Sequence, residues 1–255
     1  SNDGSRGLGD VYKRQDGNDI VDGENGTYTI GGGIGDDTLY GVAFIGSMDG
    51  GSGNDLLYGE EGDKVTMQGG SGDDFLQGVG GSYDMRGDEG QDTLVGDTGN
   101  DTLEGGSGND YLDGGDGNDQ LSESSGQNTL HGGLGNDLLD VTGGTNLMTG
   151  GDGEDTLSGY AAVATMTGGA GNDVLDGGFG TYTMSGEAGE DTLYGSSMSG
   201  SMSGGVGGDL LYVQDGTGAI MSGDEDDDLI VLESGSGTML GGTGTDSMSG
   251  YMAWL

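Results

Sequence analysis

Aspartates recur at one fixed place behind glycine-rich hexads along this chain. In the nonapeptide 50–58, with the sequence GGSGNDLLY, Asp55 follows three glycines and lies two residues before the large aliphatic Leu57. Fifteen nonapeptides carry this aspartate. Calcium takes about six to eight oxygen ligands, and such a turn offers backbone carbonyls together with one carboxylate. The residue types and their spacing therefore predict calcium coordination by main-chain and aspartate oxygens.

The aspartates form two series with a spacing of mostly 18 residues. The first series is Asp19, Asp37, Asp55, Asp74, Asp92 and Asp110, and the second is Asp101, Asp119, Asp137, Asp155, Asp173, Asp191, Asp209, Asp228 and Asp246. Nonapeptides with and without the aspartate alternate strictly, except that four successive ones between Leu94 and Leu121 all carry it. If two nonapeptides make one coil, the carboxylates line one edge and change to the other edge there, so the middle coils would bind calcium on both edges.

The nine-residue period also predicts the fold that positions these aspartates. We number each nonapeptide so that Asp55 is at position 6 and Leu57 at position 8. Position 8 is a large apolar residue in 26 units from Val21 to Met248, with one-residue insertions before Met67 and Met221. Strand alternation sends position 8 inward and positions 7 and 9 outward. Glycine at positions 1, 2 and 4 permits turns with positive φ. We expect an all-β solenoid with two nonapeptides per coil and about 13 coils.

The two kinds of nonapeptide differ at position 8. The aspartate-bearing kind has Leu there in 12 of 15 cases, and the aspartate-free kind has Met in 9 of 11. Methionine fills irregular gaps in cores. We therefore interpret the methionine column as core packing.

The pattern G-G-x-G-x-D-x-U-x, in which U is a large aliphatic residue, resembles the RTX-type calcium-binding repeats of hemolysin-type proteins over residues 16–249. The resemblance implies a right-handed parallel β-roll in which each calcium ion lies between stacked turns, with about 13 ions in all. The implied ligands are the fifteen aspartates above and carbonyl oxygens of neighbouring hexads. These carbonyls belong to Gly51, Gly53, Gly70, Gly72, Gly106, Gly108, Gly133, Gly135, Gly151, Gly153, Gly169 and Gly171. The resemblance also implies secretion by a bacterium, by the type I route, and an extracellular or cell-surface location.

The charge of the chain favours folding on calcium binding. Its formal net charge is −41, and 66 of its 255 residues are glycine. Such a chain repels itself unless counterions bind. About 13 calcium ions would reduce the charge to about −15, and extracellular calcium modules bind at ~10⁻⁴–10⁻³ M. The acidity also makes nucleic acid an improbable partner. No apolar run is long enough for a membrane span.

Other chemistry has little support in the sequence. The chain has no cysteine, and His131 is the single histidine, at an outward position 9. We therefore predict no enzyme activity. Three roles remain open: a structural module of a large secreted adhesin, surface-layer or toxin-like protein; a calcium-dependent accessory module of a secreted hydrolase or epimerase; and an ice-binding β-roll. The last rests on an outward column at position 7 of the aspartate-free units, namely Thr29, Ser47, Thr66, Thr129, Thr165, Thr183, Ser201 and Thr238. Uncapped solenoid ends would favour end-to-end self-association.

Both ends of the chain depart from the repeat. The segment Ser5–Gln15 resembles a translated sequencing adapter in a metagenomic fragment, so we expect residues 1–15 to be a non-native or disordered leader. Residues 16–249 are expected to form the β-roll. Residues 250–255 resemble the start of a further, truncated repeat.

Overall fold

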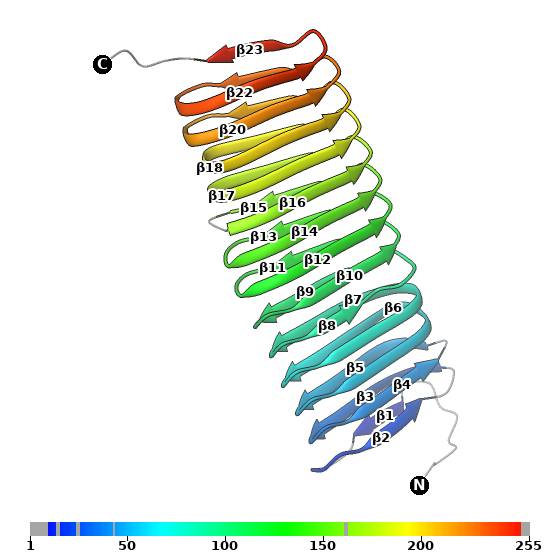
Figure 1. Cartoon of the computed structure of the whole chain (residues 1–255). Coiled ribbons are helices and arrows are strands. Elements are labelled where there is room, and N and C mark those ends of the chain that lie inside the picture. Colours follow the sequence, from blue (N-terminus) through cyan, green and yellow to red (C-terminus); the bar gives the residue numbers. More distant parts are fainter. Residues whose placement is uncertain (1–9, 14–15, 24–25, 43, 161–162, 251–255) are drawn as a thin grey trace. The chain divides into compact units, whose positions relative to one another are not determined.

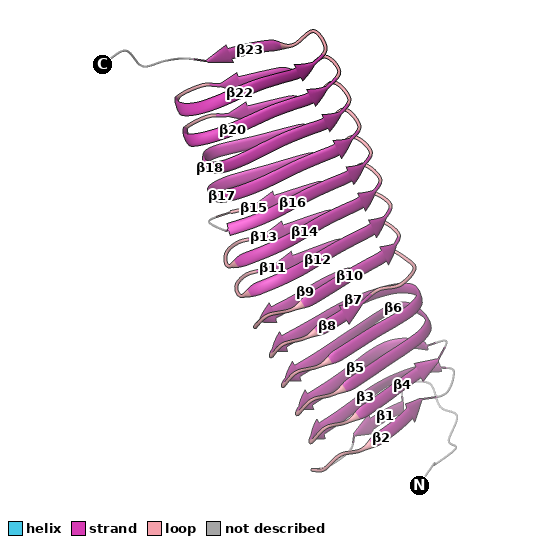
Figure 2. Cartoon of the chain, viewed as in Figure 1, coloured by secondary structure: helices cyan, strands magenta, loops and turns pink. Residues whose placement is uncertain are grey.

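The computed structural model describes residues 10–13, 16–23, 26–42, 44–160 and 163–250. The chain is a parallel β-solenoid of about 12 turns, with no helix among the described residues (Figures 1 and 2). Its contacts divide it into two units, unit 1 at Ser1–Asp116 and unit 2 at Gly117–Leu255. The expected parallel β-roll is confirmed, with about 12 turns rather than about 13.

Unit 1 contains the first ten strands. They are β1 (Asp10–Lys13), β2 (Ile20–Gly23), β3 (Gly26–Ile34), β4 (Thr38–Val42), β5 (Phe44–Ser52), β6 (Leu56–Ser71), β7 (Phe75–Glu89), β8 (Thr93–Val95), β9 (Thr102–Ser107) and β10 (Tyr111–Asp116). Strands β2 and β4 pair in parallel, as do β3 and β5, so strands alternate between two ladders. Long strands such as β6 run through two successive nonapeptides.

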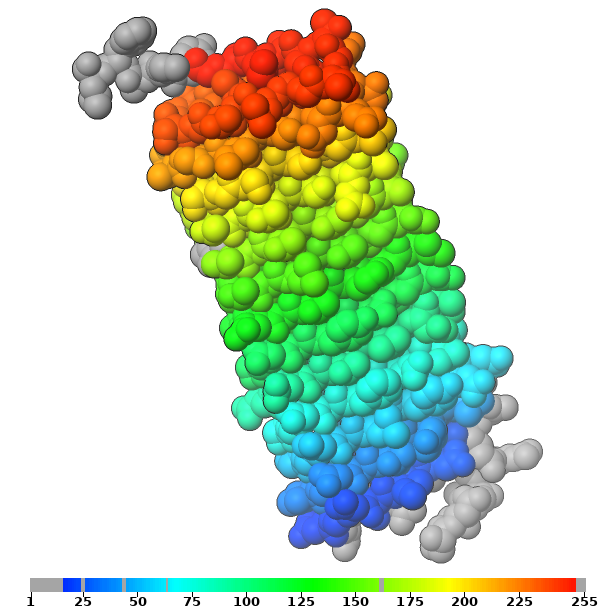
Figure 3. Space-filling view, viewed as in Figure 1, coloured from blue at the N-terminus to red at the C-terminus, as the bar shows by residue number. Residues whose placement is uncertain are grey.

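Unit 2 repeats the same plan. Its strands are β11 (Gln120–Glu123), β12 (Gln127–Leu134), β13 (Leu138–Val141), β14 (Thr145–Asp152), β15 (Thr156–Gly159), β16 (Val163–Ala170), β17 (Val174–Ala188), β18 (Thr192–Val206), β19 (Leu210–Val213), β20 (Gly216–Glu225), β21 (Leu229–Leu232), β22 (Gly235–Thr243) and β23 (Ser247–Gly250). Strand β11 pairs with β13, and β12 pairs with β14. Within each unit the colours of Figure 3 follow one another in chain order, because each turn packs on the turns before and after it.

The strand register shows that one coil contains two nonapeptides. Ile20 lies opposite Thr38 in unit 1, and Val174 lies opposite Thr192 in unit 2, an offset of 18 residues in each case. The two predicted insertions appear as irregularities in the pairing. One lies between Asp63 and Val65, and the other between Thr217 and Ala219. An extra residue in one strand is accommodated as a bulge, so the inward and outward alternation resumes after each insertion.

The position-8 column forms the core, as the alternation predicts. Leu39, Leu57, Leu157 and Met166 are completely buried, and the two positions that flank each of them are less buried. The exceptions are the last two members, Met239, which is partly exposed, and Met248, which is half exposed. Burying a large aliphatic side chain contributes about 1.5–3 kcal/mol, so one residue in nine supplies a continuous thin core.

The termini only partly fall within the described residues. Strand β1 lies inside the expected leader and pairs in parallel with β3, with Asp10 opposite Tyr28. Residues 1–9, 14–15 and 251–255 lie outside the described residues, and so does most of the expected further repeat at 250–255. The foreign origin of the leader and the bounds of the three segments remain predictions.

Candidate metal centres

The position-6 aspartates of unit 1 form a ladder of side-chain hydrogen bonds. The Oδ1 atom of each aspartate accepts a bond from the backbone N–H of the aspartate one turn earlier. The donor–acceptor pairs are Asp19–Asp37 (2.7 Å), Asp37–Asp55 (2.7 Å), Asp55–Asp74 (2.8 Å), Asp74–Asp92 (2.8 Å) and Asp92–Asp110 (2.8 Å). The first predicted series therefore lies in one stack.

Unit 2 contains an equivalent ladder. Its donor–acceptor pairs are Asp119–Asp137, Asp137–Asp155, Asp155–Asp173, Asp173–Asp191 and Asp191–Asp209 at 2.8 Å each, followed by Asp209–Asp228 at 2.9 Å and Asp228–Asp246 at 3.2 Å. The turn before Asp228 lacks the glycine of position 4. Asp226 takes that place with a φ of 75°, and the stack continues through it.

The change of edge is visible inside unit 1. Asp101 Oδ1 accepts a bond from the N–H of Tyr83, at 2.7 Å, and Tyr83 occupies position 6 of an aspartate-free turn. Strand β9, which follows Asp101, pairs with the second half of β7, whereas β10, which follows Asp110, pairs with β8. Asp101 therefore lies on a different ladder from Asp92 and Asp110, as the parity of the sequence predicts.

The second oxygen of these carboxylates is buried and has no hydrogen-bond partner. This holds for the Oδ2 atoms of Asp37, Asp55, Asp74, Asp92, Asp137, Asp155, Asp173, Asp191, Asp209 and Asp228. A buried polar atom without a partner costs about 1–3 kcal/mol, and more when it is charged. A repeated cost of this kind indicates that a cation satisfies these atoms, so the residues fit the calcium that the repeat pattern predicts.

The glycine at position 1 leaves the space beside each of these oxygens. A Cβ on Gly50 would lie less than 3.0 Å from both Asp55 Oδ2 and the carbonyl oxygen of Gly69 in the next turn. Gly150 has the same surroundings, formed by Asp155 Oδ2 and the Gly168 carbonyl. A carboxylate oxygen and a main-chain oxygen thus border one small space, which any side chain would fill. The carbonyl ligands named from the sequence were those of positions 2 and 4, so this position-1 carbonyl was not among them.

Carbonyl oxygens at positions 2 and 4 also face the next turn. Those of Gly51, Gly53, Gly72, Gly133, Gly135, Gly151, Gly153 and Gly171 lie against the Cβ position of the corresponding glycine one turn later. Gly51 and Gly53 themselves have φ values of 107° and 126°, which a side chain would disfavour. These predicted carbonyl ligands therefore lie in the gaps between turns. The carbonyls of Gly70, Gly106, Gly108 and Gly169 remain predicted ligands.

Burial raises the pKa of the stacked carboxyl groups above the ordinary value of 3.8. The pKa rises to about 6 for Asp55, Asp92, Asp137, Asp155 and Asp173, and to about 7 for Asp74 and Asp209. Desolvation is the largest cause, and negative charges nearby add to it, whereas the backbone bond at Oδ1 lowers the pKa. The stack thus disfavours its own negative charge, which a divalent cation would offset.

The aspartate-free turns fill the same inward position with other side chains. Position 6 is Tyr28, Val65, Tyr83, Asn128, Asn146, Ala164, Tyr182 or Ala219 in eight such turns, where these residues are all buried, and it is glycine in the other three, at Gly46, Gly200 and Gly237. The Tyr182 hydroxyl donates to the Gly159 carbonyl at 2.9 Å. Strand alternation places position 6 on the same side as position 8, so this signal was present in the sequence.

Two aspartate-free turns use asparagine to hold their own backbone. Asn128 Nδ2 donates to the Ser125 carbonyl at 2.8 Å, and Asn146 Nδ2 donates to the Gly143 carbonyl at 2.7 Å. Asn128 Nδ2 also lies 3.1 Å from Asn146 Oδ1. These turns satisfy a carbonyl with a side-chain amide at position 6, and the first of them also buries the carboxylate of Glu123 at position 1.

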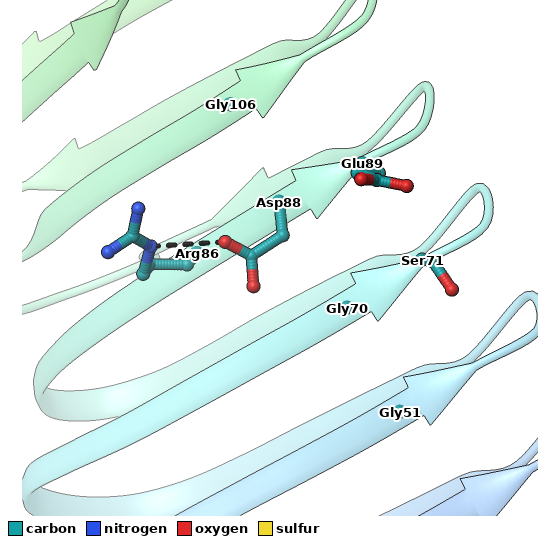
Figure 4. A pocket seen from close by; sticks show the side chains of 7 residues that line it. All are labelled: Gly51, Gly70, Ser71, Arg86, Asp88, Glu89 and Gly106. Carbon is teal, nitrogen blue, oxygen red and sulfur yellow. Dashed lines mark ion pairs between the residues drawn. The ribbon is translucent and has the colours of Figure 1, made fainter.

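No part of the described chain brings three or more His, Cys, Asp or Glu side chains together as a metal cluster. A hollow beside the first stack is lined by Gly51, Gly70, Ser71, Arg86, Asp88, Glu89 and Gly106 (Figure 4). Its Arg86 forms ion pairs with Asp88 (3.3 Å) and Glu104 (3.0 Å). Because the described residues contain no cluster of three or more such side chains, each calcium site would use one or two carboxylates and take its other ligands from the main chain. His131 is exposed on the surface.

The model of the RTX calcium-binding nonapeptide repeat family, which comprises four copies of the repeat, matches residues 40–63, 66–82, 86–121, 124–157 and 165–184. These matches cover slightly more than half of the chain, which therefore belongs to this family of calcium-binding repeats. No curated protein matches the chain. Within the described ranges, no helix is long and apolar enough to cross a membrane.

Proposed function

We propose that this chain is a calcium-dependent structural module of a large secreted bacterial protein, such as an adhesin, a surface-layer protein or a toxin-like protein. The observation that carries the proposal is the stack of buried Oδ2 atoms that lack a hydrogen-bond partner. Membership of a calcium-binding repeat family supports the identity of the cation. The proposed role is mechanical, because ions held between stacked turns would join each turn to the next.

Each part of the nonapeptide has a separate task in this module. Oδ1 of Asp155 accepts the N–H of Asp137 and holds two successive turns in register. Oδ2 of Asp155, the carbonyl of Gly168 and the position-2 and position-4 carbonyls would hold calcium in the gap between turns. Bound calcium supplies positive charge that neutralises the carboxylates. One ion in each such gap gives the about 13 ions expected from the repeat count.

The module folds where calcium is abundant. Without bound cations, a chain of net charge −41 with buried carboxylates is self-repelling. Because calcium binds a site that exists only in the folded chain, its binding free energy stabilises the fold. The chain would stay unfolded in a cell interior that is poor in calcium and become a roll outside, which agrees with an extracellular location.

A calcium titration of the full chain followed by circular dichroism tests the proposal. We expect a coil spectrum in chelator, a β spectrum in millimolar calcium, and return to coil when chelator is added. The count of bound ions, measured by native mass spectrometry, should approach 13. A spectrum that does not change with calcium would overturn the proposal.

A matched pair of variants separates the aspartate edge from the opposite strands. Asp155→Ala removes one carboxylate from the stack and should weaken the ions in the adjoining gaps. Thr165→Ala changes an exposed residue of an aspartate-free strand and should leave calcium binding intact. Equal loss of calcium affinity in both variants would contradict the assignment of ligands.

One observation favours a second candidate function, ice binding, for unit 2. Outward positions 7 and 9 of its aspartate-free strands present Thr165 and Thr183 beside Thr167 and Ser185, without a charged residue among them. The exposed Leu147 and Ile220 interrupt this face. An ice-recrystallisation assay in calcium would show inhibition that Thr165→Lys abolishes. No inhibition by the wild-type chain would exclude this function.

A further inference from the structure

Position 5 of the aspartate-bearing turns forms a second ladder beside the position-6 ladder. Its side-chain Oδ1 atom accepts a bond from the backbone N–H of position 5 one turn later. The acceptor–donor pairs are Asn18–Asp36, Asp36–Asn54, Asn54–Asp73 and Asp73–Gln91 in unit 1, and Asn118–Asn136, Asn136–Glu154, Asn172–Glu190 and Asp227–Thr245 in unit 2, at 2.7–3.1 Å. These pairs lie at the exposed surface, so the need to pair buried polar groups does not explain their hydrogen bonds.

The two ladders run in opposite directions. Asp137 Oδ1 accepts from the N–H of Asp119, in the turn before it, at 2.8 Å. The adjacent Asn136 Oδ1 accepts from the N–H of Glu154, in the turn after it, at 3.0 Å. One dipeptide thus fixes the turns on both sides of itself.

The position-5 bond also determines where a predicted ligand points. The N–H of Glu154 and the carbonyl of Gly153 belong to one planar trans peptide group, so they point in opposite directions. Because Asn136 holds this N–H toward the preceding turn, the Gly153 carbonyl is directed toward the following turn. The structure shows this carbonyl against Gly171 of the following turn. The same relation links Asp36, the N–H of Asn54 and the carbonyl of Gly53 in unit 1.

We propose that the position-5 Asn or Asp is a positioning residue for calcium, which aims the position-4 carbonyl of the next turn into the ion-binding gap. This inference rests on the proposed calcium-dependent function. It assigns Asn54, Asn136 and Asn172, together with Asp36, Asp73 and Asp227, a role outside the predicted ligand set. Groups that orient metal ligands in this way typically change metal affinity by about 10–100-fold.

Gly208 interrupts the position-5 ladder. It occupies position 5 but has no side chain to accept the N–H of Asp227. Its φ lies outside the left-handed region, and a Cβ there would lie 3.1 Å from the Asp227 carbonyl oxygen, a tight contact that requires a small shift. The gap that receives the Asp226 carbonyl should therefore bind calcium more weakly than the gap that receives the Gly153 carbonyl, because Asn136 holds that peptide group in place.

Removal and restoration of the acceptor test the proposal in the full chain. Asn136→Ala should raise the free calcium needed for the last ions by about tenfold, whereas Asn136→Asp should bind like the wild type because Asp36 and Asp73 accept the same bond. Gly208→Asn should lower the calcium requirement of the weakest ions, and Gly208→Ala controls for the added Cβ. The measurements are ion counts by native mass spectrometry at stepped calcium concentrations and the circular dichroism midpoint.

The outcomes separate the two proposals. A wild-type chain that binds no calcium overturns the proposed function and this inference together. Normal wild-type binding with an unchanged ion count in Asn136→Ala overturns the positioning role alone. Loss of thermal stability in Asn136→Ala with full calcium occupancy, and no rescue by Asn136→Asp, would reduce the ladder to a structural role and also overturn the inference.

Discussion

The aspartate-bearing and aspartate-free turns use the same nine-residue plan but fill the inward position 6 differently. Asp155 carries a carboxylate oxygen that is buried without a hydrogen-bond partner beside the space left by Gly150. Tyr182, in an aspartate-free turn, is completely buried, and its hydroxyl finds the Gly159 carbonyl. One kind of turn leaves a space suited to a cation, whereas the other is filled by its own side chain.

Packing volumes around the aspartate-free edge support this comparison. Where position 6 is Tyr182, the neighbouring position 1 is Gly177, and a Cβ there would collide with the ring. Where position 6 is Ala219, position 1 is the larger Val213. Where position 6 is Gly237, in the next turn, position 1 is Leu232, and both of these position-1 residues are buried. In these turns, large side chains at position 1 or position 6 fill the inward space without metal. We infer that calcium dependence resides in the aspartate stacks alone.

A change of pH acts on every aspartate stack at once and should have the largest effect. The folded pKa values of about 6 to 7, for example at Asp155 and Asp209, are raised above the unfolded value. In chelator, these groups therefore contribute full stability below about pH 4 and lose it as the pH rises through 6 to 7. In the presence of calcium, stability should instead fall as the pH falls, because calcium binds the ionised groups. The calcium concentration at which half of the chain is folded should therefore rise as the pH falls from 8 to 5. Circular dichroism titrations measure both trends, and a midpoint independent of pH would contradict the comparison.

Tyr182→Ala should destabilise the chain by about 3–5 kcal/mol, because it empties a fully buried site. The loss should appear in urea unfolding at saturating calcium, while the number of bound ions stays at the wild-type value. Tyr182→Phe, which keeps the ring and loses one hydrogen bond, is the control and should cost about 1 kcal/mol. Fewer bound ions in Tyr182→Ala would show that the two edges are not independent.

Gly150→Ala should cost about 1–3 kcal/mol through overpacking, and it should also remove calcium from the gap beside Asp155. The reason is that the new methyl group occupies the space between Asp155 Oδ2 and the Gly168 carbonyl. Gly143→Ala, in an aspartate-free turn, meets a backbone oxygen at 3.1 Å and should lose no ion. Native mass spectrometry measures the difference. Full occupancy in Gly150→Ala would place the ion elsewhere.

Asn146→Ala should have the smallest effect, about 1–2 kcal/mol, because the bond to the Gly143 carbonyl and the bond from Asn128 Nδ2 are lost at an aspartate-free edge. At constant pH, the calcium concentration at which half of the chain is folded should shift only by the amount that this loss of stability accounts for. Thermal unfolding in calcium and an ion count check this expectation. A loss of ions would mean that this turn also holds metal.

Much of the candidate site could be predicted from sequence because the repeat is local. The period of nine, the inward column through Leu57 and Leu157, and the aspartate at position 6 follow from strand alternation and glycine turns. Asp92 and Asp101 belong to successive nonapeptides, which predicted that they lie on different ladders. The structure confirms this, because β8 pairs with the first part of β7 and β9 pairs with its second part.

Only the tertiary structure decided what happens between turns. The bond from the N–H of Glu154 to Asn136 joins residues 18 positions apart. The Gly69 carbonyl approaches Gly50, 19 positions earlier, beside the unpartnered Oδ2 of Asp55. These relations arise from stacking of turns at a strand spacing of about 4.8 Å, which a linear pattern does not contain. The sequence by itself determined which residue is available at each place in a turn. The stacking determined which oxygen faces a hydrogen-bond donor and which one faces a space suited to a cation.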